Sequence, residues 1–270
     1  MRATTAPVGW MARTIAGDLV PVEMLCPDGQ WPAAWRPGPD VVGLYQRAKV
    51  IATNGAEFEA WVRTAPLPQS RVVASAEAIE GGFIRVLGDT HSHGPQGEHA
   101  HERTDGHTWI DPINAIAQAG AIQRAMSAAF PEFADRFAAN LAALDADMQA
   151  LHARLENLDT TSVKVIAPDS PFGYIARRYD WFAMPLDGDT KAWFDALDEV
   201  DLETLMTDRT HAIVLCETAP DADTAAELLA EHRVRAVVWT TGELTGDANY
   251  AQILSQNIDH LEEAVNALLP

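Results

Sequence analysis

The chain has few cysteines, few basic residues and no long apolar run. Its 270 residues include only two cysteines, Cys26 and Cys216, which excludes a framework of several disulfides. We expect two buried thiols, with a single bridge between them as the alternative. No apolar stretch approaches the roughly 20 residues that a membrane span needs. The sequence therefore predicts no transmembrane helix.

Basic residues are scarce relative to acidic ones. The sequence contains 19 Lys and Arg but 39 Asp and Glu, which gives a net charge of −20. Phosphates would be repelled by such a surface, so we expect no nucleic-acid partner. The first residues, 1–6, lack the apolar core of a signal peptide. We expect either a cytoplasmic protein or the mature form of an exported one.

Common catalytic motifs are also missing. The sequence contains no His-Glu-x-x-His, no phosphate-binding glycine loop and no Gly-x-Ser-x-Gly. A metallohydrolase is the alternative, because His91-x-His93 with Asp89 nearby could bind a catalytic metal. That cluster lies among glycine and proline, where a catalytic geometry would be poorly preorganised. We therefore predict that the chain is not an enzyme.

Histidine, by contrast, is concentrated in one short stretch. Five of the 9 histidines fall between positions 91 and 107: His91, His93, His99, His101 and His107. An extended backbone places alternate side chains on one face, so imidazoles at His-x-His spacing can meet one Zn²⁺. Because Gly94, Pro95 and Gly97 interrupt regular structure, we predict a mobile His-rich loop over 89–105. A solvated loop without a function is the alternative.

Strand-like and helix-like segments alternate on both sides of one long helical pattern. This alternation predicts an α/β fold with two lobes and parallel sheets. We expect an N-terminal lobe at 1–128, a long rigid backbone helix within a linking segment at 129–160, and a C-terminal lobe at 161–270. Apolar residues three and four apart predict a single stripe along that helix, made of Phe133, Phe137, Leu141, Leu144, Met148, Leu151 and Leu155.

Shorter patterns predict individual elements in each lobe. Strands are expected at 21–26, 49–53, 72–74, 83–87, 163–167, 211–216 and 234–239. Helices are expected at 41–47, from Glu57 onward, and at 171–179, 221–232 and 250–269. A further helix should start at Asp111-Pro112, with an acidic N-cap followed by proline at the first helical position.

Several short segments, in this order, point to one family. They include Pro7-Val8-Gly9-Trp10, Asn54-Gly55-Ala56-Glu57-Phe58-Glu59, His107-Thr108-Trp109-Ile110-Asp111-Pro112 and Phe172-Gly173-Tyr174. With them, essentially the whole chain resembles the zinc- and manganese-binding receptors of bacterial ABC importers, the metal-specific periplasmic solute-binding proteins. The histidines that precede His107 resemble those of the zinc branch.

This resemblance implies a function and a setting. It implies two α/β lobes joined by a rigid helix, with a metal buried between them, and delivery of that metal to the permease of an ABC importer. The expected metal is Zn²⁺, with Mn²⁺ second. A periplasmic or extracytoplasmic location and a monomeric receptor complete the expectation.

The family's four ligand positions are only partly filled here. The resemblance implies His107 as the second ligand and Asp169 as the third. The first position falls on Ala33, which has no ligand atom in its side chain. The fourth falls near Thr240-Thr241, where the family's aspartate is missing and only Glu243 supplies a carboxylate. One imidazole and two carboxylates would form a site with harder ligand atoms, which selects less strongly for zinc over hard cations.

Three alternatives follow from these substitutions. The loop histidines, especially His99 and His101, complete a site around His107. In the second alternative, water completes a site made by His107, Asp169 and Glu243. In the third alternative, the cleft expected between the two lobes no longer binds metal tightly. The protein then buffers metal through its His-rich loop, or the cleft takes another ligand against Trp31, Trp35 and Trp239. Trp35, flanked by Arg36 and prolines, is expected to be partly exposed.

Overall fold

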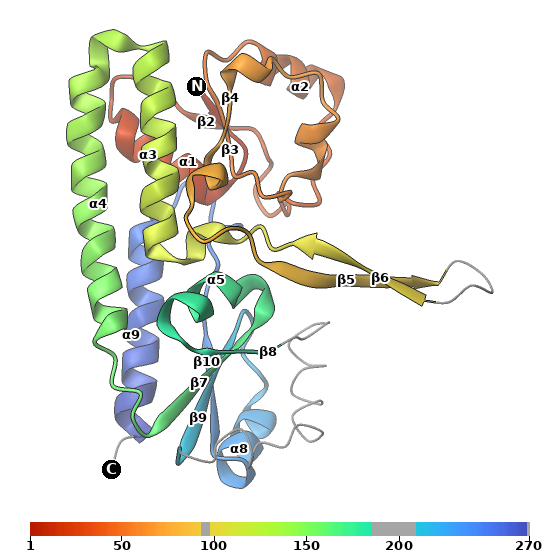
Figure 1. The fold of residues 1–270 in the computed structure, drawn as a ribbon, viewed down its shortest axis with the longest axis vertical. Coiled ribbons are helices and arrows are strands. Elements are labelled where there is room, and N and C mark those ends of the chain that lie inside the picture. Colours follow the sequence, from red (N-terminus) through yellow and green to blue (C-terminus); the bar gives the residue numbers. More distant parts are fainter. Residues whose placement is uncertain (93–97, 185–208, 269–270) are drawn as a thin grey trace. The chain divides into compact units, whose positions relative to one another are not determined.

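The computed structural model describes residues 1–92, 98–184 and 209–268, and their side chains except those of 87–92, 98–101 and Asp169. The chain forms two compact units. Unit 1 comprises Met1–Phe83, Gly106–His152 and Thr241–Ile253, and unit 2 comprises Ile84–Asp105, Ala153–Thr240 and Leu254–Pro270. Each unit has its own parallel sheet (Figure 1). The predicted α/β class with parallel sheets is confirmed.

The sheet of unit 1 has the strand order β2-β1-β3-β4, and its neighbouring strands all run parallel. The strands are short: β1 is Arg2–Ala3, β2 Glu23–Met24, β3 Ile51–Thr53 and β4 Val72–Ala74. The chain passes from β1 to one side of the sheet and then to β3 on the other side. Ligands commonly bind at the carboxyl ends of strands beside such a reversal.

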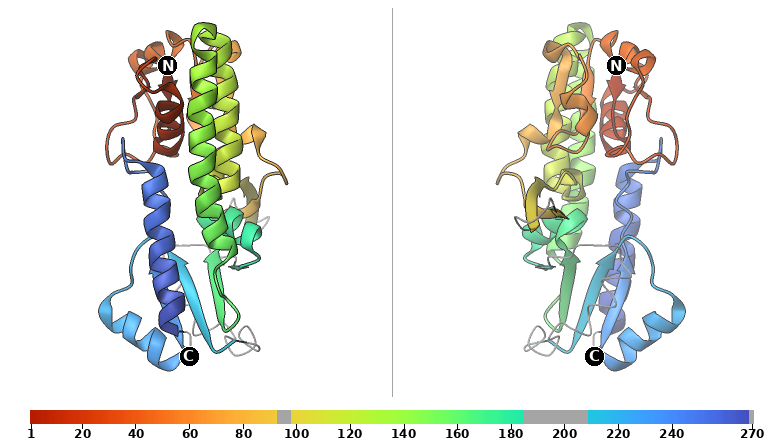
Figure 2. Two further views of the ribbon diagram at one scale, coloured as in Figure 1. Left: turned by 90° about the vertical axis from the view of Figure 1, so that its left-hand side faces the viewer. Right: turned by 90° about the vertical axis from the view of Figure 1, so that its right-hand side faces the viewer.

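Helices and one-turn 3-10 segments pack around this sheet. They are α1 Ala6–Ala16, α2 Pro39–Gln46, α3 Pro112–Ala129, the first part of α4 Ala134–Glu156, and the 3-10 segments Ala60–Arg63, Gln69–Arg71, Ser75–Ala78, Thr108–Ile110 and Pro131–Phe133. Figure 2 shows α3 and α4 side by side. The Asp111 side chain accepts a hydrogen bond from the Ile113 N–H at 2.9 Å, which confirms the predicted N-cap of α3.

The long helix α4 carries the apolar stripe predicted from the sequence. Phe137 and Met148 are 0% exposed and Leu144 is 1% exposed, whereas the residues between them are mostly exposed. The helix is preceded by the 3-10 turn Pro131–Phe133. One buried face and one solvated face are what a spacing of three and four residues produces in a helix.

The sheet of unit 2 has the order β10-β9-β7-β8, again with parallel neighbours. Its strands are β7 Val163–Pro168, β8 Phe182–Met184, β9 His211–Cys216 and β10 Val234–Val238, and its helices are α5 Asp169–Tyr179, α8 Ala222–Glu231 and most of α9 Tyr250–Leu268. Ile166, Val214 and Val234 are 0% exposed in its core. Three of these four strands were predicted, and β8 was not.

The described residues of the segment 89–105 are not the irregular loop that the sequence predicted, and the mobility of the segment stays a prediction. They form two antiparallel strands, β5 Arg85–Ser92 and β6 Glu98–Thr104, in which His91 is the register partner of His99. The residues on which that prediction depended, Gly94, Pro95 and Gly97, lie outside the described residues. The flanking segments pair through backbone hydrogen bonds, which require no apolar side chains.

Two local predictions in unit 1 are also wrong. The helix expected from Glu57 onward is only the 3-10 segment Ala60–Arg63, because Ala56 and Glu57 have φ values of 48° and 61° that no right-handed helix can include. Trp35 is only 9% exposed, because its ring packs edge-on against Trp61 at 5.8 Å instead of facing solvent.

Both cysteines are buried thiols, as expected. Burial raises the pKa of Cys26 to about 11 and that of Cys216 to about 12, so each thiol keeps its proton at neutral pH. Within the described parts of the chain, no helix combines the length and the apolarity that a bilayer span requires.

Replacement of Leu144 by alanine should lower the free energy of unfolding by about 3 kcal/mol, because the truncation leaves a cavity in the face of α4 that packs on unit 1. Leu141→Ala is the matched control on the same stripe. Leu141 is only half-buried, so its loss should lower stability by about 1 kcal/mol. Urea denaturation followed by circular dichroism measures both. Equal losses for the two variants would contradict the burial of this face.

Candidate functional site

A buried polar network lies at the carboxyl ends of β1 and β3. Glu59, only 3% exposed, accepts hydrogen bonds from the Thr4 hydroxyl, from the Asn54 N–H at 2.7 Å and from the Gly55 N–H at 3.1 Å. Burial raises the pKa of Glu59 above its usual value, and these hydrogen bonds oppose that shift. The carboxyl group thereby fixes the turn that follows β3.

Asn54 connects this network to the segment that carries His107. Its side-chain amide donates to the Gly106 carbonyl at 2.8 Å, and its Oδ1 accepts from the Gln118 amide at 2.9 Å. The Thr108 hydroxyl lies 3.1 Å from Gln118 Oε1. Residues on both sides of His107 are thus bonded to buried amides, which fixes the backbone at this position.

Aromatic rings enclose the imidazole of His107. The Phe58 ring meets it edge-on at a centroid distance of 5.3 Å, and the Trp109 ring lies at the same distance. Gly106 permits the approach of Phe58, because a Cβ at position 106 would lie 2.7 Å from two atoms of that side chain. The site therefore depends sterically on glycine at position 106.

A second segment, 241–250, is held against the first. The Trp109 indole N–H donates to the Thr241 carbonyl at 2.8 Å, and the Tyr250 hydroxyl donates to the Trp109 carbonyl at 3.3 Å. Between them, Gly242 has a φ of 87°, and a Cβ there would lie 2.7 Å from the Tyr250 ring. This left-handed turn directs the following residue, Glu243, toward the imidazole.

The two segments bring His107 and Glu243 together. Nε2 of His107 lies 3.0 Å from Oε1 of Glu243, and the two residues are 8% and 6% exposed. The other carboxylate oxygen, Oε2, accepts a hydrogen bond from the Trp31 indole N–H. Each oxygen of Glu243 is therefore engaged by a different partner. The sequence predicted two of these residues as ligands, but it indicated no bond from Trp31.

The pair has the geometry of two ligands for one metal ion. Zn²⁺ binds histidine nitrogen and carboxylate oxygen at about 2.0–2.2 Å, so two tetrahedral ligands lie about 3.4 Å apart. The observed 3.0 Å would have to open only slightly. Among the described side chains, no three His, Cys, Asp or Glu residues gather closely enough to hold a metal. Further ligands would come from water or from side chains outside that set.

The other predicted ligands lie in unit 2. Asp169 is the first residue of α5, directly after the carboxyl end of β7. His91 and His99 are register partners across β5 and β6, and His101 also lies in β6. The remaining predicted ligand, His93, falls outside the described residues.

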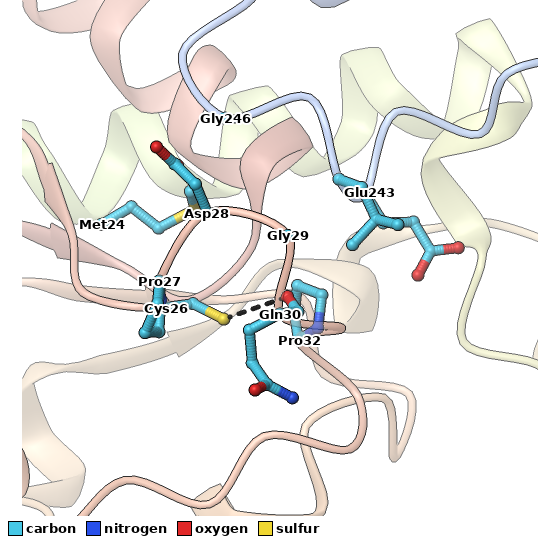
Figure 3. Close-up of a pocket in the computed structure, with 10 residues that line it drawn as sticks. Met24, Cys26, Pro27, Asp28, Gly29, Gln30, Pro32, Glu243 and Gly246 are labelled. Atoms are coloured by element: carbon cyan, nitrogen blue, oxygen red, sulfur yellow. Dashed lines mark hydrogen bonds between the residues drawn. The ribbon is translucent and has the colours of Figure 1, made fainter.

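A small pocket lies beside Glu243. Its volume of about 10 Å³ has room for about one water molecule, and it is lined by Met24, Cys26, Pro27, Asp28, Gly29, Gln30, Pro32, Glu243, Leu244 and Gly246. Figure 3 shows the Glu243 carboxylate directed away from Cys26 and Asp28. The Cys26 thiol instead donates to the Gln30 carbonyl at 3.4 Å. These two side chains therefore do not join the His107–Glu243 pair.

The sequence profile of the family described as periplasmic zinc-uptake complex component A (ZnuA) matches residues 2–264. The chain belongs to this family. Among curated relatives, the zinc-binding lipoprotein AdcA of Streptococcus pneumoniae TIGR4 is 28% identical over 192 residues, which are 68% of this chain and 38% of AdcA. The high-affinity zinc uptake system protein ZnuA of Yersinia pestis is 25% identical over 186 residues, 62% of this chain and 56% of that protein.

Solved structures share the fold of this ZnuA-family chain. The metal-dependent lipoprotein YcdH of Bacillus subtilis has a TM-score of 0.74 and 21% identity, with 97% of each chain covered. Zn(II)-bound AdcA of S. pneumoniae has a TM-score of 0.72 and 23% identity, with 98% of this chain and 57% of AdcA covered. The two-lobed metal-receptor fold predicted from the sequence is confirmed.

Gly106→Ala should displace the His107 segment from Phe58, because the new methyl group overlaps the phenyl ring. We expect a loss of stability of about 1–3 kcal/mol. Gly120→Ala in α3 is the matched control. A Cβ there meets only the flexible end of Arg124 at 3.4 Å, so the variant should gain up to about 1 kcal/mol from helix propensity. Thermal unfolding of both variants checks this, and a neutral Gly106→Ala would contradict the steric argument.

Proposed function

We propose that this protein is an extracytoplasmic solute-binding receptor for a divalent transition metal, which it delivers to the permease of an ABC importer. Zinc is the first candidate and manganese the second. The observation that carries this proposal is the buried His107–Glu243 pair, whose nitrogen and oxygen atoms lie 3.0 Å apart. An imidazole and a carboxylate that converge in an enclosed position are typical ligands of Zn²⁺.

The chemistry of the pair favours a borderline metal. Imidazole suits zinc, copper, iron and nickel, whereas a site of carboxylates alone suits magnesium, calcium or manganese. Aromatic side chains around His107 limit the access of water, which strengthens its bonds to a cation. The pair therefore supports a transition metal as cargo in preference to an alkaline-earth ion.

Membership of the ZnuA family supports the remaining parts of the proposal. The family description places its members in the periplasm and in zinc uptake, and relatives carry names that specify zinc binding. One structural neighbour, FpvC from Pseudomonas aeruginosa, holds Mn²⁺, which supports manganese as the second candidate. We propose a monomeric receptor that binds and releases metal and is not an enzyme.

His107→Ala and Glu243→Gln should each weaken Zn²⁺ binding by ~100-fold or more, because each removes one of the ligands that the structure brings together. Calorimetric titration of Zn²⁺ into metal-stripped protein measures the affinity. His260→Ala is the control, since His260 is exposed on α9 and should be replaceable without effect. Unchanged affinity in the first two variants would overturn the proposed site.

Asp169 remains a predicted third ligand. Asp169→Asn keeps the size of the side chain and removes its charge, so the same titration should show weaker Zn²⁺ binding, by roughly 10-fold or more, if the carboxylate coordinates the metal. An unaltered affinity would assign Asp169 to the start of α5 alone.

Histidines of β5, β6 and the intervening residues should hold additional zinc weakly. Simultaneous replacement of His91, His93, His99 and His101 by alanine should lower the number of Zn²⁺ ions bound without unfolding the protein. Neutral imidazole is required for binding, so this additional binding should decline as the pH falls through about 6.5. Equilibrium dialysis at several pH values tests both points, and an unchanged stoichiometry would contradict them.

A further inference from the structure

An exposed tryptophan is bonded to the buried carboxylate of the candidate site. The Trp31 indole N–H donates to Oε2 of Glu243, while Oε1 faces His107 at 3.0 Å. Trp31 is 48% exposed, although Glu243 is only 6% exposed. The ring therefore contributes little to the core of unit 1, and its polar edge is directed at one oxygen of a predicted metal ligand.

Two anchored turns set the position of Trp31. On one side, the Gln30 N–H donates to the Pro27 carbonyl at 3.1 Å. On the other, the N–H groups of Ala34 and Trp35 donate to the Trp31 carbonyl at 3.2 and 3.0 Å, and Trp35 is itself buried. The backbone of Trp31 is thus fixed from both directions, so the indole is held on Glu243 by the loop.

The bond to Trp31 restricts how Glu243 can bind a metal. A free carboxylate coordinates through one oxygen or through both, and hard cations with high coordination numbers make use of the second oxygen. Here the indole lies against Oε2, which leaves Oε1, beside Nε2 of His107, as the available donor. Coordination through one oxygen suits tetrahedral Zn²⁺ better than Mn²⁺, which prefers six oxygen-rich ligands.

We propose that Trp31 is a specificity-determining residue, which favours Zn²⁺ over Mn²⁺ by confining Glu243 to coordination through Oε1. This inference rests on the proposed function, because it requires the His107–Glu243 pair to bind the metal. Trp31 acts through Glu243 and is not itself a ligand, since an indole N–H has no lone pair to give.

The test compares Trp31→Phe with Trp35→Phe. The first removes the N–H donor to Glu243, and the second removes an indole of the same loop whose ring packs against Trp61. Calorimetric titration of Zn²⁺ and Mn²⁺ into the metal-stripped full chain gives the ratio of the two dissociation constants. We expect Trp31→Phe to reduce the preference for zinc by about 10-fold, mainly through tighter Mn²⁺ binding, and Trp35→Phe to leave the ratio unchanged.

A second variant and a second readout separate this role from a structural one. Trp31→Leu also lacks the donor, so it should shift the ratio in the same direction as Trp31→Phe. Visible absorption of bound Co²⁺ reports coordination number, because tetrahedral Co²⁺ absorbs far more strongly than six-coordinate Co²⁺. Both variants should weaken this absorption relative to the unaltered protein as Oε2 becomes a ligand.

Three results would overturn the proposal: an unchanged ratio with an unchanged Co²⁺ spectrum, an equal weakening of both metals, or the same shift in Trp35→Phe. None of them bears on the proposed function. That function is tested separately by His107→Ala and Glu243→Gln. If those variants bind Zn²⁺ and Mn²⁺ normally, the site itself is wrong, whatever Trp31 does.

Discussion

The hydrogen bond from the Trp109 indole to the Thr241 carbonyl joins the two chain segments on which the candidate site depends. These residues are 132 positions apart, and the Tyr250 hydroxyl adds a second bond to the Trp109 backbone. Once the segments are joined, Glu243 can be buried, because its carboxylate meets His107 and Trp31 in place of water. An unpartnered buried carboxylate would be strongly unfavourable. The approach of His107 and Glu243 is therefore a consequence of aromatic and backbone contacts made elsewhere.

Elements with a strong local signal could be predicted from the sequence. The continuous apolar run at 212–216 predicts β9, and the stripe on α4 follows the helical period. Helix α1 carries no such signal, because nine of its 11 residues are buried and polar residues do not alternate with apolar ones. Strand β1 has only two residues, too few for any period. The apolar residues at 83–87 predicted the start of β5, but its polar continuation and its pairing with β6 are backbone contacts that hydrophobic patterning cannot detect.

The residues of the candidate site likewise differ in how far the sequence could predict them. His107 was predicted as a ligand through the family resemblance of the run His107 to Pro112, and the same run forms the 3-10 turn and the N-cap of α3. Glu243 could be proposed only because no other carboxylate lies near Thr241. Its approach to His107 depends on the left-handed turn at Gly242, which side-chain patterns do not specify. Trp31 was named only as a possible contact for another ligand, because nothing in the sequence indicates that its indole is bonded to a carboxylate 212 residues away.

A buried polar network holds the backbone on both sides of His107. Asn54 and Gln118 fix the backbone around His107 through fully bonded buried amides, and such networks resist rearrangement. In the proposed receptor, His107 and Glu243 would be in place before the metal arrives, so their ordering would not reduce its affinity. Two ligands alone leave at least half of a tetrahedral shell to water or to other groups.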